Sequence, residues 1–470
     1  MTDLDQRLGD VFRVVDDHRD LYVQWLQELC RIPSVAAQNR GMEEAAQQVR
    51  RYLEALAAGP AEAGGTVQLV PTSGFPVVYA EFPGTSPRTL LFYNHYDVQP
   101  EDPVELWHYP PFGAEIHDGV MYARGVADNK GNLIARIAAV HALKQALGEL
   151  PLRVKFVAEG EEEIGSVHLP EFCRNHPDLL QADGCIWEFG YKDAEGRLQV
   201  YLGVKGILYV ELVCRGASQD LHSANAAIVP NPAWRLVQAL NTLKDPATGR
   251  VQIDGFYDDV EPPTEQDEAM LAQMTYSEEA MKQRLKIPAF VNGVTGQDLK
   301  RQLVFSPTCN ICGLTSGYQG EGSKTVLPSV ARAKLDFRLV PRQDPHKILA
   351  QLKEHLRKHG YGDIEVIEWG LEHPARTRPG ETIARSVAAM AEKVYGQAPN
   401  VLPSSAGTGP MYEVCHRFGT PAVSVGVGNF ASNNHAPNEN IRVEDFVQGI
   451  KLMAAVMLDF AQRDLDLGTR

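Results

Sequence analysis

The order of helix and strand patterns changes twice along this 470-residue chain, and that change constrains the fold more than any other feature. Residues 1–205 alternate amphipathic helical patterns with short apolar strand patterns. Residues 206–372 follow the order β-α-β-β-α-β, which is typical of a ferredoxin-like unit, with a helical insertion at 264–285. The alternation returns over residues 373–470. We therefore predict an α/β fold: a discontinuous catalytic domain, 1–205 plus 373–470, interrupted by an inserted ferredoxin-like domain at 206–372.

Composition and charge exclude several classes of protein. A hydrophobic content of 44% with 22% charged residues is typical of a globular domain, and a net charge of -15 offers no basic surface for nucleic acid or anionic lipid. The first twenty residues contain six Asp and no apolar core of a signal peptide, and the apolar run at 452–458 is too short to span a bilayer. The seven cysteines do not form the pattern of a disulfide framework. We expect a cytoplasmic protein with no nucleic-acid or membrane partner.

Polar side chains follow the predicted strands at the point where each strand ends. His95 and Asp97 come after the strand at 89–93, and the period of two places them on the same side, where the carboxylate could orient the imidazole. Asp128 lies in a polar turn that opens the next helix. Taken alone, this Asp would be an ordinary helix cap, and the His an ordinary loop residue.

Three further strands end in groups of the same kind. Glu162 and Glu163 follow the strand at 153–158, Glu188 directly follows the strand at 184–187, and His435 comes after a strand at 421–427. Acidic runs are usually solvated, but the run that contains Glu162 and Glu163 directly follows a strand whose apolar pattern predicts burial. Open α/β sheets place their sites at strand ends, and His with carboxylate is the ligand set of divalent cations. The pattern therefore predicts a site for two divalent ions.

The charges of these residues support two ions. Three ionised carboxylates contribute -3, two neutral imidazoles contribute nothing, and two divalent cations contribute +4. A bridging hydroxide would bring the site to zero, and such a hydroxide is the nucleophile that two-metal hydrolases generate near neutral pH.

The five motifs, in this order and at these separations, resemble the di-zinc metallopeptidase family that includes carnosine dipeptidase, carboxypeptidase G, aminoacylase, acetylornithine deacetylase and succinyl-diaminopimelate desuccinylase. The resemblance covers residues 21–461, and segments 93–100 and 107–112 are most similar to the carnosine dipeptidase branch and its bacterial relatives. Asn94 and Ala224 stand where the family often has Gly, and Glu188 is Asp in several branches. These departures leave the substrate preference open.

The resemblance implies a role for each site residue. Asp97 would orient His95, Glu162 would be the general base, and the Asp128-Asn129 peptide bond would be cis. It also implies two metal ions per subunit, with Zn²⁺ favoured and Mn²⁺ or Co²⁺ as alternatives. The implied ligands are His95 and Glu188 for one ion, Glu163 and His435 for the other, and Asp128 for both.

The inserted domain carries the remaining implied residues. The family uses this domain as a lid and as the contact of a homodimer. His222, in the motif at 220–223, would reach the active site of the partner subunit and polarise the substrate carbonyl. Arg338 would bind the substrate carboxylate, and the turn containing Gly407, Thr408 and Gly409 would form a backbone cradle opposite it.

The resemblance implies an enzyme that hydrolyses the peptide bond of dipeptides or short peptides with a free C-terminal carboxylate. An N-acyl amino acid deacylase of the same family is the close alternative. A catalytically silent binding protein is a remote one, because every expected ligand and Glu162 are present. The side chains of the substrate, the native metal and the role of the Cys309/Cys312 pair stay open at this point.

Overall fold

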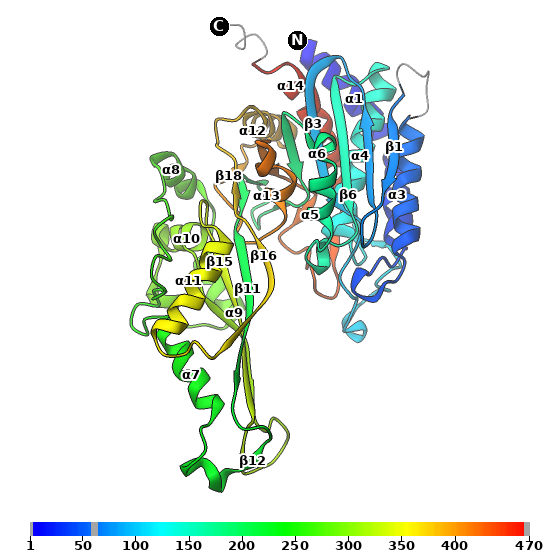
Figure 1. Cartoon of the computed structure of the whole chain (residues 1–470). Coiled ribbons are helices and arrows are strands. Elements are labelled where there is room, and N and C mark those ends of the chain that lie inside the picture. Colours follow the sequence, from blue (N-terminus) through cyan, green and yellow to red (C-terminus); the bar gives the residue numbers. More distant parts are fainter. Residues whose placement is uncertain (1–2, 58–63, 465–470) are drawn as a thin grey trace.

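The computed structural model describes residues 3–57 and 64–464. Its largest element is a mixed eight-stranded sheet in which β3, β6 and β7 run parallel in the middle (Figure 1). Parallel neighbours bring their carboxyl ends to one edge of the sheet, where His95 ends β3. In spatial order the strands are β1 (Thr66–Val70), β2 (Val77–Phe82), β6 (Leu152–Glu159), β3 (Ser86–His95), β7 (Gly184–Trp187), β19 (Ala422–Ser424), β9 (Gln199–Tyr201) and β18 (Asn400–Leu402).

Helices cover both faces of this sheet, which explains why its central strands are apolar on both sides. Leu90 and Phe92 of β3 pack into one hydrophobic core, while Leu91 and Tyr93 pack into another on the opposite face. The first core is closed by α1 (Asp3–Asp17), α2 (Arg19–Cys30), α3 (Met42–Ala57), α4 (Gly131–Leu147), α12 (Thr382–Tyr395) and α14 (Val443–Gln462). The second is closed by α5 (Leu169–Asn175), α6 (Pro177–Leu180) and α13 (Met411–Val414).

Helix α1 is an element that our reading of the sequence missed. Five of the six aspartates among the first twenty residues lie in this helix, yet Leu8, Val11 and Val15 recur at helical spacing and are buried. They pack against α4 and α14, two helices that are buried over most of their surface.

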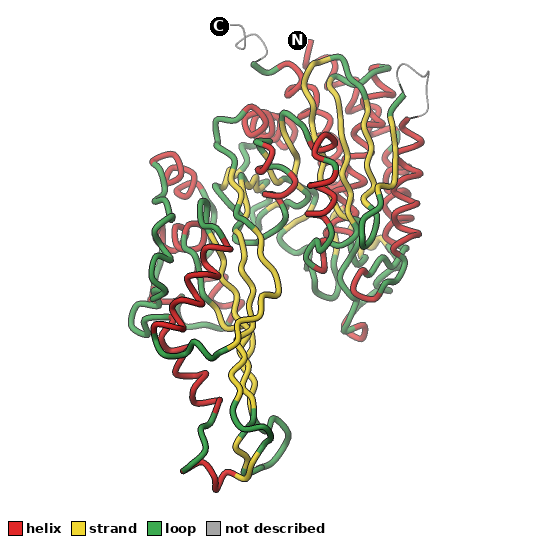
Figure 2. The backbone as a smooth tube through the Cα atoms, viewed as in Figure 1, coloured by secondary structure: helices red, strands yellow, loops and turns green. Residues whose placement is uncertain are grey.

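The inserted unit is a separate antiparallel sheet, in the order β13 (Asn310–Ser316), β15 (Val330–Leu339), β11 (Gly206–Arg215), β16 (Glu365–Glu372). Helices α7 (Pro232–Leu243) and α11 (Pro345–Lys358) pack on one side of it (Figure 2). This is the predicted ferredoxin-like arrangement, so the predicted fold class is confirmed. The domain boundaries at 205/206 and 372/373 stay predictions.

The helical insertion is longer than the sequence pattern indicated. It consists of α8 (Glu265–Gln273), α9 (Glu278–Leu285) and α10 (Gly296–Phe305), of which only the first two were expected. Small elements complete the chain: β12 (Leu221–His222) pairs with β14 (Val326–Leu327), and β20 (Gly428–Asn429) pairs with β8 (Tyr191–Lys192). Within residues 3–57 and 64–464, no helix combines the length and the apolar character needed to cross a membrane.

Candidate metal centre

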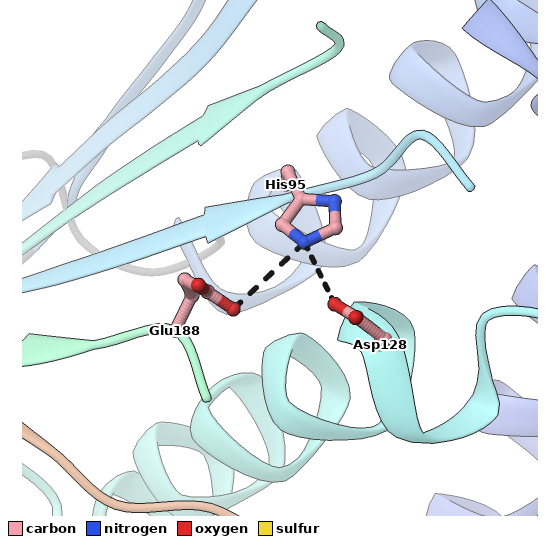
Figure 3. A group of neighbouring side chains, drawn as sticks. All are labelled: His95, Asp128 and Glu188. Carbon is pink, nitrogen blue, oxygen red and sulfur yellow. Dashed lines mark hydrogen bonds and ion pairs between the residues drawn. The ribbon is translucent and has the colours of Figure 1, made fainter. Parts of the chain in front are cut away.

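His95 is the buried centre of the candidate site. Its Nε2 atom lies 3.1 Å from Asp128 Oδ1 and 3.8 Å from an oxygen of Glu188 (Figure 3). An oxygen of Glu162 is also 3.8 Å from this nitrogen. The other ring nitrogen, Nδ1, lies 3.3 Å from the Asp97 carboxylate and 3.1 Å from the Asp97 carbonyl oxygen. One side of the ring therefore faces a group of carboxylates, and the other is held by Asp97.

Asp128 lies between two histidines. Its Oδ1 atom faces His95, and its Oδ2 atom is 3.1 Å from His435 Nε2. The same His435 nitrogen is 3.1 Å from Glu163 Oε2. Strand ends that are far apart in the sequence thus converge around one carboxylate.

The donor atoms are spaced as ligands of shared ions would be. Two ligand atoms that each lie about 2 Å from one ion at a tetrahedral angle are roughly 3.3 Å apart. Glu163 Oε1 is also buried without a hydrogen-bond partner, which leaves a donor free for an ion. The residues therefore fit a pair of divalent cations. Among the residues that the structure describes, three groups offer one donor atom from each member with these atoms within 4.8 Å of one another: His95, Asp128 and Glu188; His95, Glu162 and Glu163; and Asp128, Glu163 and His435.

Several carboxyl groups share this buried site. Burial raises the pKa of Glu162 and of Glu163 above the usual carboxyl range and the pKa of Glu188 to about 8, and repulsion between neighbouring carboxylates adds to each rise. Hydrogen bonds to Asp128 and Glu163 raise the pKa of His435 to about 11. Divalent cations would relieve this repulsion and keep the carboxylates ionised and the imidazoles neutral.

Glu439 holds the loop that carries Asp128. Its buried carboxylate accepts hydrogen bonds from the backbone N–H groups of Gly125, Ala127 and Asp128 at 2.9 to 3.0 Å, and from Arg124 at 2.8 Å. The Asp128-Asn129 peptide bond is cis, as the resemblance implied. The positioning role of Glu439 was not anticipated, and its place in the segment that follows His435 was the only sequence signal for it.

Asp97 and Arg136 fix the ends of the strands. Besides facing His95, the Asp97 carboxylate accepts the backbone N–H groups of Glu162 at 3.3 Å and of Glu163 at 2.9 Å. The buried Arg136 guanidinium donates to the carbonyl oxygen of Tyr93, near the end of β3, and to that of Trp187, which ends β7, at 2.6 Å each. Arg136 was also missed, although an arginine in the middle of an apolar helix is a signal that could have identified it.

A cleft of about 570 Å³ opens beside the cluster. Glu162, Glu188, Asp128 and His435 lie on its walls, together with other residues that include Gly407 and Thr408.

The predicted carboxylate-binding residues meet at this wall of the cleft. Arg338 donates to Thr408 Oγ1 at 2.7 Å and to Asp336 at 3.2 Å, so the structure brings the predicted Arg and the predicted turn together. Gly409, the next residue of the turn, lies beside the buried Trp187 ring, and a Cβ at that position would meet the ring at 3.6 Å.

His222 is the one predicted site residue that the structure keeps away from the cluster. It ends β12, which lies at the tip of the inserted domain farthest from the large sheet (Figure 1). The side chain is exposed, and its Nδ1 atom accepts the backbone N–H of Ala224 at 3.1 Å.

Comparisons with known proteins agree with this geometry. Residues 91–459 match the model of peptidase family M20/M25/M40. A solved structure of an M20 family metallo-carboxypeptidase from Sulfolobus solfataricus is 41% identical, with a TM-score of 0.88 over 94% of this chain and 99% of that one. Human Beta-Ala-His dipeptidase is 29% identical over 97% of this chain and 93% of its own length. A Cys-Gly metallodipeptidase from Schizosaccharomyces pombe is 26% identical over 97% and 98%.

The family match spans more than half of the chain and includes each strand end that contributes to the cluster. By name, the two relatives are a dipeptidase and a metallodipeptidase, and the solved structure is a metallo-carboxypeptidase. All three align over nearly their whole lengths. The resemblance seen in the five sequence motifs is thereby confirmed. This chain belongs to peptidase family M20/M25/M40 and is a metallopeptidase.

Proposed function

We propose that this enzyme hydrolyses the peptide bond of dipeptides or short peptides that carry a free C-terminal carboxylate. The observation that carries the proposal is the position of Asp128 at the edge of a cleft. One of its carboxylate oxygens lies 3.1 Å from His95, and the other lies 3.1 Å from His435. The relatives named for β-Ala-His and Cys-Gly dipeptides support a short peptide as the substrate.

The metal ligands follow from the contacts. We assign His95 and Glu188 to one ion, Glu163 and His435 to the other, and Asp128 to both. When bound, two divalent ions would polarise the substrate carbonyl and lower the pKa of a water molecule between them. We favour Zn²⁺, as the resemblance implied, and Mn²⁺ and Co²⁺ are the alternatives because all three ions accept mixed nitrogen and oxygen ligands.

The chain's own residues would orient the substrate and move the proton. Glu162 lines the cleft, so its carboxylate can take a proton from the attacking water and return it to the departing amine nitrogen. Arg338 and the turn at 407–409 would hold the C-terminal carboxylate of the substrate. Asp97 would keep His95 in one orientation through its contact with Nδ1.

A matched pair of substrates tests this function against the alternative. The metal-loaded enzyme should hydrolyse Ala-Leu with a much larger kcat/KM than N-acetyl-leucine. The two substrates share the C-terminal leucine and differ only in the group on its nitrogen, which is alanyl in the first and acetyl in the second. β-Ala-His and Cys-Gly complete the panel. Faster release of acetate than of alanine would make the protein an N-acyl amino acid deacylase, and no turnover of either would support a silent binding protein.

We also propose a homodimer through the inserted domain. Strand β13 is an edge of its sheet, and Ile311 and Leu314 on it are each 50% exposed. Trp234 on α7 is 69% exposed. An open edge strand beside exposed apolar side chains is a surface that a second copy could cover. In such a dimer, His222 at the tip of one subunit would serve the active site of the other.

Mixing two inactive variants tests that arrangement. His222→Ala should lower turnover without changing the metal content, and a mixture with Glu162→Gln should recover activity after subunit exchange. Random pairing makes half of the dimers mixed, and each mixed dimer has one intact site, so we expect about a quarter of wild-type activity. No recovery in mixtures shown to exchange subunits, or full activity of a sedimenting monomer, would refute the proposal.

A cytoplasmic location is part of the proposal as well. All seven cysteines are unpaired in the structure, which suits a reducing compartment. Cys309 is buried, and Cys312 donates to Asp336 at 3.3 Å. We therefore assign this pair a role in the packing of the inserted domain.

A further inference from the structure

A second cavity, of about 390 Å³, adjoins the metal cleft. We name it the side compartment. It shares four wall residues with the cleft: Tyr191, Met281, Arg284 and Phe430. Its volume lies in the range of roughly 300 to 1,000 Å³ that small-molecule sites occupy. A group bound over the metal cluster could therefore extend a side chain into this second space.

The side compartment is formed where the helical insertion meets the large sheet. Helix α9 supplies Met281 and Arg284 to both cavities, three residues apart on one face of the helix. The apolar residues of the other walls come from the segment between α8 and α9, from α10, and from strands β9 and β18. They include Met274, Tyr276, Leu303, Val304, Tyr201 and Leu402.

Several polar groups on these walls already have partners inside the protein. The Asp193 carboxylate accepts from Thr275 Oγ1 at 2.6 Å and from the side-chain amides of Gln199 and Asn400. The Tyr201 hydroxyl donates to the Tyr191 hydroxyl at 2.7 Å. These groups are satisfied, so the surface left to bind a ligand consists mainly of apolar side chains, with Glu195 and Arg284 as the charged wall residues.

The boundary between the two cavities exposes large apolar side chains. Phe430 is 53% exposed and Tyr191 40% exposed, although both belong to the walls of a cleft. The Arg284 guanidinium lies 5.8 Å from the centre of the Phe430 ring. Exposed aromatic surface in a concave site is a feature of binding surfaces.

We propose that the side compartment receives a bulky apolar or aromatic side chain of the peptide substrate. This inference rests on the proposed peptidase function and adds a substrate class to it. The side chain could belong to the residue before or after the cleaved bond, because both flank the metal cluster. The structure thereby assigns a specificity role to the helical insertion, which holds none of the metal ligands.

Four dipeptides test the inference and identify the residue that binds. For the metal-loaded wild-type enzyme, kcat/KM is compared for Phe-Gly with Ala-Gly, and for Gly-Phe with Gly-Ala. At least one phenylalanyl peptide should exceed its alanyl counterpart by about 10-fold or more, the discrimination that an apolar pocket provides. The pair that shows the preference identifies the residue whose side chain enters the compartment.

A filled compartment gives the second arm of the test. Ala280 on α9 lines the side compartment but not the cleft, and it is exposed, so Ala280→Trp should narrow the cavity and leave the fold intact. We expect this variant to lose the preference for the phenylalanyl peptide by about 10-fold and to keep wild-type kcat/KM on the alanyl peptide. Gln283→Trp, on the same helix and on neither wall, is the matched control and should change neither value.

The outcomes separate this inference from the function on which it rests. Hydrolysis of the alanyl peptides without any preference for Phe would refute the compartment and leave the peptidase function standing. Equal losses on all four peptides in Ala280→Trp would refute it too, because the change would then act on the cleft or the fold. No hydrolysis of any peptide by the metal-loaded wild-type enzyme would refute both.

Discussion

Glu162→Gln is expected to lower kcat for a dipeptide by about 10²- to 10⁴-fold while the metal content stays that of the wild type. The amide keeps the shape of the side chain but cannot take a proton from water or return it to the amine nitrogen. Glu162 lines the cleft, and its side chain is 19% exposed, so its carboxylate can reach a substrate. The measurements are steady-state kinetics at saturating dipeptide and metal analysis of the same sample.

The neighbouring residue provides the control. The Glu163 side chain is only 4% exposed, and its Oε2 atom contacts His435 at 3.1 Å and accepts from Gln99 at 2.9 Å. Its other oxygen is buried without a partner. Glu163→Gln should therefore lose the ion beside His435, and lose activity as a consequence. Near wild-type turnover in metal-replete Glu162→Gln would place the general base on another residue.

The order of elements made the fold predictable. The switch from alternating helices and strands to β-α-β-β-α-β and back follows from hydrophobic periodicity, and β3, β7, β11 and β15 were all located within a few residues. Helix α1 was missed because charge obscured its apolar stripe, and α10 because only Leu299, Val304 and Phe305 of its ten residues are buried. Sheet order and register depend on packing between distant segments, which no local pattern encodes.

The candidate site was predictable where chemistry and strand ends coincide. His95, Glu162 and Glu188 each lie at or just beyond the end of a strand, and a common edge brings them together. The residues that hold them in place were not foreseen. Glu439 accepts hydrogen bonds from backbone N–H groups, and Arg136 donates hydrogen bonds to backbone carbonyl oxygens. In both cases the backbone groups are far away in the sequence. Such partners become visible only when the fold has brought the segments together.

The side compartment could not have been predicted from the sequence at all. Met281 and Phe430 belong to segments that the sequence assigned to different domains, and neither lies in a motif. The shape of a cavity depends on how the helical insertion packs on the large sheet. Specificity residues of this kind are therefore the part of a peptidase that motifs describe least.

Asp128→Asn is expected to have the largest effect of any single change, the loss of both metal ions and of measurable turnover. Each Asp128 oxygen faces one histidine at 3.1 Å, so removing its charge weakens both halves of the site together. The asparagine keeps the size of the side chain and the backbone N–H that Glu439 accepts, so the loop should stay in place. Metal analysis after dialysis, with kcat measured on the same sample, gives the result.

Two further variants distinguish a shared ligand from a ligand of one ion. Glu188→Gln should weaken only the ion beside His95, and Glu163→Gln only the ion beside His435, so each should retain about one ion per chain while Asp128→Asn retains none. Thermal unfolding adds a readout that does not depend on activity. Metal at 100 times its Kd should stabilise the wild type by about 2.7 kcal/mol for each ion bound, and should leave the unfolding of Asp128→Asn unchanged. Two ions and near wild-type turnover in Asp128→Asn would show that the two halves of the site do not share this carboxylate.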